Sequence, residues 1–262
     1  MLSIAIPSSA LINETDPKIK TFKVGMIARA CAIFRVDEIL IYRDPKLDES
    51  DFIKDVLEYM ETPQYLRKYL IPIKPSLRYA GVLPPLRIPS HKPKHLKVGE
   101  IREGVVRRVA PDGTCWVDIG VDALASLKPK RKLKRGARVT VRVCSKKPLV
   151  VEEAEPDEYW GYKVKKVELR DILKRNNVVV TSRKCEVVSL DELRQTLKSP
   201  LTLIFGSPEE GVFEIAKRLG IRIDAKCWNT IPMQGVETVR LEEAIFATLA
   251  IVNIVKGWLD EV

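Results

Sequence analysis

Two glycine-bearing loops near the carboxyl end constrain the fold of this 262-residue chain most strongly. The first, residues 203–211, contains the end of an apolar run that stops at Gly206, and glycine allows a backbone angle or a close approach that a side chain would forbid. Ser207, Pro208 and two glutamates follow, and this order predicts a helix that opens at Pro208. The second loop, residues 229–238, also precedes a helical pattern. In open α/β sheets, loops that each connect a strand to a helix form the crevice in which a ligand binds. The two loops therefore predict a ligand site.

Strand and helix patterns alternate on both sides of the middle third, as in a parallel α/β sheet. The predicted strands span residues 2–6, 38–42, 177–183, 201–205 and 222–225, and the predicted helices span 18–34, 51–68, 167–174 and 241–259. The first helix carries Ile19, Phe22, Met26, Ala30 and Ile33 on one side. We therefore expect one α/β domain interrupted by a different module.

The middle third is strongly basic and reads as short strands. Residues 76–150 contain 18 Lys and Arg but only 5 Asp and Glu. The whole chain contains 45 and 35, so the rest of the chain holds 27 basic and 30 acidic residues. Strand-like runs separated by turns at 111–113 and 135–136 suggest a small barrel that resembles an OB or S1-like fold, a type that binds single-stranded nucleic acid. The charge predicts a module that faces a polyanion.

Basic side chains on this module are the predicted RNA contacts. They are Lys128, Lys130, Arg131, Lys132, Lys134 and Arg135 in one loop, together with Arg107 and Arg108. A charge run is often only a solvated face, but the basic character of the whole module favours a phosphate-contacting loop with a steep salt dependence. Trp116 could stack on a base, although we favour a core position for it.

The two loops, with Glu242, Glu243 and Ala244 after them, resemble the SPOUT superfamily of RNA methyltransferases, and in particular a branch with an OB-like insertion that is associated with uridine N3 methylation. The resemblance covers nearly the whole chain. It implies a trefoil knot whose loops bind S-adenosylmethionine, and a homodimer with shared active sites. The predicted fold is a SPOUT-like knotted parallel sheet (residues 1–75 plus 160–262) with an inserted OB-like β-barrel (residues 76–159).

Cofactor contacts are predicted from the loops and from the resemblance. Gly206, Gly211 and Gly235 leave backbone groups accessible for an adenine, and Ile231 and Val239 supply apolar walls. The full set is Thr181, Ser182, Arg183, Phe205, Gly206, Ser207, Gly211, Asn229, Thr230, Ile231, Gln234, Gly235, Thr238 and Val239, in which the resemblance supplies Thr181, Ser182, Arg183, Asn229 and Thr230. A P-loop is disfavoured because no Lys-Ser/Thr pair follows Gly211.

Three charged residues are the predicted catalytic groups. Residues 23–29 resemble the first SPOUT motif, with Lys23 where many members have Asn, and Arg29 matches the arginine near the partner's cofactor. A solvated helix charge is the equal alternative for Arg29. Arg29 and Arg240 would stabilise negative charge developing on a uridine, and Glu237 would be either the base or a salt-bridged loop carboxylate.

The remaining features narrow the class of protein. Five scattered cysteines predict reduced thiols in a cytoplasmic protein, and His91 and His95 lack the further ligands of a metal site. No membrane segment is visible. We predict an S-adenosylmethionine-dependent methyltransferase acting on uridine N3 of ribosomal RNA. The alternatives are a non-catalytic RNA-binding or ribosome-assembly protein, and an α/β enzyme for a small acidic substrate, which leaves the basic barrel unexplained.

Overall fold

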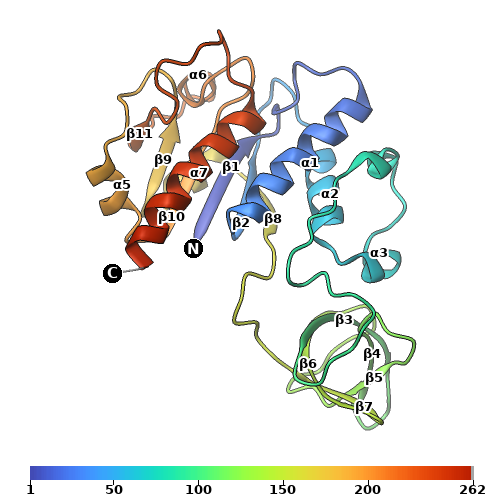
Figure 1. The fold of residues 1–262 in the computed structure, drawn as a ribbon. Coiled ribbons are helices and arrows are strands. Elements are labelled where there is room, and N and C mark those ends of the chain that lie inside the picture. Colours follow the sequence, from blue (N-terminus) through green and yellow to red (C-terminus); the bar gives the residue numbers. More distant parts are fainter. Residues whose placement is uncertain (261–262) are drawn as a thin grey trace. The chain divides into compact units, whose positions relative to one another are not determined.

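The computed structural model describes residues 1–260 and divides into two compact units. The first comprises Met1–Glu58, Ser76–Pro84 and the chain from Tyr162 onward, and the second comprises Tyr59–Pro75 and Pro85–Gly161. Figure 1 follows the chain through a parallel sheet and a closed barrel. These two features of the predicted fold are confirmed.

The first unit is built on six parallel strands in the order β11-β9-β10-β1-β2-β8. Their bounds are β1 (Leu2–Pro7), β2 (Glu38–Tyr42), β8 (Lys163–Val167), β9 (Val178–Thr181), β10 (Leu201–Ile204) and β11 (Lys226–Trp228). β1, β2 and β10 are buried along their whole length, as expected for parallel strands covered on both faces. The carboxyl ends of β9, β10 and β11 meet at one edge, which is where the predicted loops begin.

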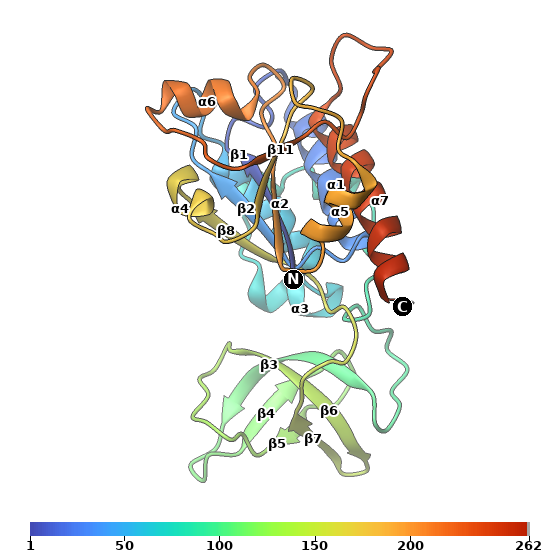
Figure 2. The same ribbon diagram turned by 90° about the vertical axis from the view of Figure 1, so that its left-hand side faces the viewer.

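Helices cover both faces of this sheet. The α-helices that begin in the first unit are α1 (Pro17–Ile33), α2 (Ser50–Glu61), α4 (Leu169–Leu173), α5 (Leu190–Thr196), α6 (Val212–Arg218) and α7 (Leu241–Asp260). Helix α3 (Gln64–Leu70) lies in the second unit, and two 3₁₀ turns span Pro75–Leu77 and Ala80–Val82. Figure 2 shows α1, α5 and α7 on one side of the sheet and α4 and α6 on the other. Ile172 of α4 and Ile215 of α6 pack in one core with Tyr42, Val180 and Ile204. No helix among residues 1–260 is long and apolar enough to cross a bilayer.

The second unit contains the barrel, with strand order β3-β4-β5-β7-β6. The strands are β3 (Ile101–Val109), β4 (Cys115–Asp118), β5 (Ala125–Leu127), β6 (Arg138–Lys146) and β7 (Leu149–Glu153). β3 pairs with β6 to close the barrel, and β5 and β7 are parallel. Val106, Val117, Val141 and Leu133 fill the interior.

Several predicted elements need correction. The helix predicted at 51–68 is two helices, α2 and α3, because Pro63 lies between them and cannot donate a helical hydrogen bond. The helix predicted to open at Pro208 begins at Val212. The strand predicted at 222–225 lies at Lys226–Trp228, and the short, basic β8 was not predicted.

Three of the five residues on the apolar side predicted for α1 are exposed, whereas Ala30 is buried and Met26 is half-buried. Ile19, Phe22 and Ile33 keep 46%, 47% and 50% of their surface, while Val24 and Ile27 are among the residues that α1 buries. The helix predicted at 241–259 is α7, and it buries one face made of Leu241, Ile245, Leu249, Val252 and Val255.

Candidate functional site

A cavity of about 370 Å³ lies at the carboxyl ends of β9, β10 and β11. Thirteen of the predicted cofactor contacts line it: Thr181, Ser182, Arg183, Phe205, Gly206, Ser207, Gly211, Asn229, Thr230, Ile231, Gln234, Thr238 and Val239. The remaining one, Gly235, is not among the lining residues. The volume of the cavity falls in the range typical of small-molecule and cofactor sites.

The loop after β10 forms one wall of the cavity and is internally rigid. The backbone N–H of Ser207 donates to the carbonyl of Glu210 at 2.8 Å, and the N–H of Glu210 donates to the Ser207 hydroxyl at 2.9 Å. A Cβ on Gly206 would lie 2.7 Å from the Glu210 carbonyl oxygen and 2.8 Å from the Cα of Gly211. Only glycine therefore fits at position 206 without displacing this wall.

Side chains from β2 and from α6 hold this loop in place. The buried Tyr42 hydroxyl donates a 2.7 Å hydrogen bond to the carbonyl of Phe205. Arg218 on α6 forms ion pairs with Asp44, at 2.9 Å, and with Glu210, at 2.6 Å. The loop is thus fixed through its backbone and through a carboxylate.

The chain around Asp44 is itself held at the end of β1. The carboxylate of Asp44 is fully buried and accepts a 2.6 Å hydrogen bond from the Ser9 hydroxyl, and the N–H of Asp44 donates to the Ser8 hydroxyl at 2.9 Å. Burial opposes its ionisation, but the hydrogen bonds from Arg218 and Ser9 outweigh it and lower the pKa of Asp44. Asp44 therefore presents a fixed negative charge to Arg218.

The second predicted loop is tied to α7 and to the loop after β9. The hydroxyls of Thr230 and Thr248 lie 2.7 Å apart in a buried pair. The Asn229 side chain accepts a 3.1 Å hydrogen bond from the N–H of Ile231, and its amide donates to the carbonyl of Arg183 at 3.4 Å. These contacts fix the second loop, whose residues Asn229, Thr230 and Ile231 also line the cavity.

Charged side chains of both signs line the cavity. Arg183 donates a 2.7 Å hydrogen bond to the carbonyl of Glu237. Lys184 pairs with the carboxylate of Glu214, and this contact lowers the pKa of Glu214. The site can therefore accept a ligand that carries both positive and negative groups.

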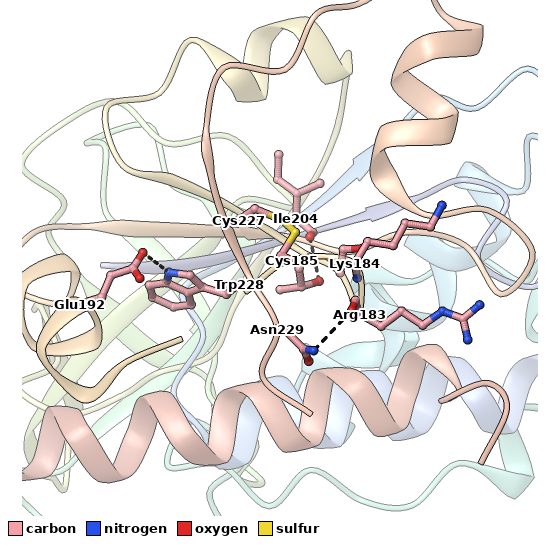
Figure 3. The surroundings of a disulfide bond; sticks show 10 residues. Arg183, Lys184, Cys185, Glu192, Ile204, Cys227, Trp228 and Asn229 are labelled. Carbon is pink, nitrogen blue, oxygen red and sulfur yellow. Dashed lines mark hydrogen bonds between the residues drawn. A yellow bond between two sulfur atoms is a disulfide. The ribbon is translucent and has the colours of Figure 1, made fainter. Parts of the chain in front are cut away.

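A disulfide joins Cys185 to Cys227, which corrects the prediction of reduced thiols for these two cysteines, whereas Cys31, Cys115 and Cys144 are free. Figure 3 shows it beside Arg183, Lys184 and Asn229, between the segment after β9 and β11. The two Cα atoms are 5.8 Å apart, although the cysteines are 42 residues apart in sequence. Spacing gave no sign of this pair, because the fold alone brings β9 and β11 together.

The predicted catalytic residues lie outside the lining of the cavity. Arg240 and Glu237 are exposed in the segment before α7, and the backbone N–H of Arg240 donates to Glu243 at 2.9 Å. Arg29 is half-buried on α1. Lys23, from the same motif, forms ion pairs with Glu14 and Glu242.

Sequence reasoning missed nine lining residues: Lys184, Pro208, Glu209, Glu210, Glu214, Trp228, Leu241, Ala244 and Thr248. Most of them adjoin predicted residues, so the loops themselves were the available signal. Thr248 lies about two turns inside α7, and no neighbouring sequence pattern marks it as a cavity residue. Among residues 1–260, no three His, Cys, Asp or Glu side chains lie close enough together to bind a metal ion.

The predicted RNA-contacting side chains lie on the barrel unit. Lys128, Lys130, Arg131, Lys132, Lys134 and Arg135 are exposed between β5 and β6. Leu133 in the middle of this loop is buried in the barrel core, which anchors the loop. The core position favoured for Trp116 is wrong: Cys115 and Val117 point inward, and Trp116 lies on the outer surface between them.

The chain combines an α/β sheet that has a cavity at its carboxyl edge with a basic β-barrel. This combination is typical of proteins that bind a small molecule and a polyanion. A family model described as "Putative RNA methyltransferase" matches residues 1–252. The chain belongs to this family of RNA methyltransferases, and it is an RNA methyltransferase.

Its relatives include proteins with named activities. The human 28S rRNA (uridine-N(3))-methyltransferase is 32% identical, over 95% of this chain and 77% of the human protein, and the mouse enzyme of the same name is 31% identical, over 95% and 75%. An uncharacterised protein of Halobacterium salinarum is 35% identical over 94% of this chain and 96% of its own length.

Proposed function

We propose that this protein transfers a methyl group from S-adenosylmethionine to N3 of a uridine in ribosomal RNA. The observation that carries the proposal is the cavity shared by the loops after β9, β10 and β11. The names of the human and mouse relatives supply the uridine N3 and the ribosomal RNA.

The lining of the cavity suits S-adenosylmethionine. Backbone groups beside Gly206 and Gly211 would hold the adenosine, with Ile231 as an apolar wall. Arg183 and Lys184 would face the carboxylate of the amino-acid end, and lining carboxylates suit its ammonium and sulfonium charges. When bound, the donor supplies an electrophilic methyl group on sulfur. The residues of this chain supply position and exclude water, and most of the rate would come from that.

The acceptor nitrogen must lose its proton, so the reaction would need a base to accept the proton and a cation to stabilise the negative charge left on the uracil. Arg240 and Arg29 would stabilise the negative charge that develops on the uracil, and Glu237 would receive the imide proton. Arg240 and Glu237 precede α7 in the segment that also supplies the lining residues Thr238 and Val239. N3 is engaged in pairing within a duplex, so the target uridine would be in a loop or flipped out.

We also propose a SPOUT fold with a trefoil knot and a homodimer that buries α1 and α7. These helices pack against each other and lie side by side in Figure 1. Ile19, Phe22 and Ile33 of α1 are exposed, as are Ile254 and Trp258 of α7. Exposed apolar patches of this kind mark interfaces. In such a dimer, Arg29 of α1 would lie near the partner's cavity, as the resemblance implies.

The test is transfer of isotope-labelled methyl groups to ribosomal RNA that lacks the modification, followed by mass spectrometry of the nucleosides. The proposal predicts labelled N3-methyluridine. Label on another atom would overturn the choice of acceptor, and absence of label together with absence of donor binding would overturn the proposal as a whole.

A further inference from the structure

Helix α3 is locked onto the barrel and extends its outer surface. The Tyr65 hydroxyl donates a 2.9 Å hydrogen bond to the carbonyl of Glu103 on β3. Gly120 has a φ of +83°, and a Cβ at this position would lie 2.6 Å from the Tyr65 ring. The ring therefore packs directly on the backbone after β4, so α3, β3 and β4 form one surface within the second unit.

One helical turn later, Tyr69 is held on the same surface. Its hydroxyl donates a 2.9 Å hydrogen bond to the carboxylate of Asp118. The Arg107 guanidinium lies 3.8 Å from the centroid of its ring, and the Lys68 ammonium lies 4.6 Å from it. Tyr69 is thus an oriented aromatic ring with two cations on it.

A second aromatic ring with a guanidinium lies on the same outer side of β4 as Asp118, the partner of Tyr69, at a point where β3 is irregular. The register of β3 against β4 shifts between Val106 and Arg108, so Arg107 and the next residue both avoid the barrel interior. Arg108 is exposed, and its guanidinium lies 5.4 Å from the centroid of the Trp116 ring on β4.

Together, Lys68, Tyr69, Arg107, Arg108 and Trp116 form what we call the α3–β4 face. We propose that this face binds an unpaired stretch of the RNA substrate, with bases stacking on its rings and guanidinium planes and phosphates contacting its cations. The proposal rests on the proposed function for the presence of RNA. Aromatic rings and arginines are what single-stranded RNA sites use, and they distinguish this face from the 128–135 loop, which offers charge without a ring.

Charge and position support this occupant. The face carries three cations, and the carboxylate next to it, Asp118, already accepts hydrogen bonds from Tyr69 and from the N–H of Gly120. The face includes Trp116 on β4, the second strand of the barrel, and the second strand belongs to the surface over which OB-type barrels bind oligonucleotides. Duplex RNA would gain little from the rings, because its bases are already stacked.

The experiment measures binding of the full-length protein to a uridine-rich single strand of about 12 nucleotides and to a duplex of the same length. We expect Trp116→Ala to weaken single-strand binding about tenfold and Trp116→Phe to leave it nearly unchanged, since a phenyl ring still stacks. Arg107→Ala and Arg108→Ala should each reduce the slope of log affinity against log salt by about one. Arg142→Ala, which removes a cation from β6, is the matched control and should change the affinity much less.

Thermal melting and S-adenosylmethionine binding of each variant separate the possible outcomes. If Trp116→Ala melts and binds the donor as the wild type does but loses the single strand, the face is established. Unchanged single-strand binding, or tighter binding of the duplex, overturns it. If the wild type binds no donor, the proposed function fails, while the comparison of the Trp116 variants still decides this inference.

Discussion

The guanidinium of Arg218 lies 2.9 Å from the buried carboxylate of Asp44. The same guanidinium reaches Glu210 at 2.6 Å, and Glu210 lines the cavity whereas Arg218 and Asp44 do not. Arg218 on α6 and Asp44 after β2 therefore hold the loop around Gly206 in place, although neither residue belongs to that loop.

We predict that Arg218→Ala destabilises the fold by about 2 kcal/mol, because the buried carboxylate of Asp44 loses the hydrogen bond from a partly exposed cation. The displaced loop should also weaken donor binding severalfold. Chemical denaturation and calorimetry measure the two effects. Lys217→Ala removes the neighbouring, exposed cation of α6 and is the matched control. Equal behaviour of the two variants would show that the Asp44–Arg218 pair does not support the loop.

The pH dependence of stability should report on Asp44. Its pKa is lower in the folded protein than the value of about 3.9 in an unfolded chain. Its contribution is therefore fully present above pH 4 to 5 and is lost as the pH falls through the folded pKa. The difference in unfolding free energy between wild type and Asp44→Asn should be largest near neutral pH and shrink in acid. A difference that grows as the pH falls would contradict the assignment of a charged Asp44.

Reduction of the Cys185–Cys227 disulfide should destabilise the protein by about 4 kcal/mol, because it frees a loop of 42 residues in the unfolded chain. Donor affinity should fall as well, since the bond lies between two segments that line the cavity. Melting with and without a dithiol reductant, compared with the Cys185→Ser/Cys227→Ser variant, measures this. Cys144→Ser, which alters an exposed free thiol, should change neither property. If the reductant lowers the melting temperature of the double variant as much as that of the wild type, the disulfide is not the cause.

The sequence was most informative where local chemistry and fold agree. Strand Glu38–Tyr42 was predicted at its observed bounds because a short apolar run between helical patterns has few other readings. The loops around Gly206 and Asn229 were found because their residue types are unusual for their positions.

The features that sequence reasoning missed depend on contacts between distant residues. The disulfide exists because β11 pairs with β9, an order that no local pattern encodes. Trp116 was assigned to the core because an aromatic in a strand is usually buried, and only the register of β4 shows which side it faces. The support of the Gly206 loop by Asp44 and Arg218 links residues 174 positions apart, so it required the fold.

The central claim is that the loops at the sheet edge bind a methyl donor, and calorimetric titration of S-adenosylmethionine tests it most directly. We predict one site per chain in the wild type, and at least a tenfold loss of affinity in Gly206→Ala, whose new Cβ would meet backbone atoms at 2.7 and 2.8 Å. Gly81→Ala, at a glycine with no atom near the new Cβ, should bind as the wild type does. Absence of binding by the wild type, or equal binding by Gly206→Ala, would contradict the claim.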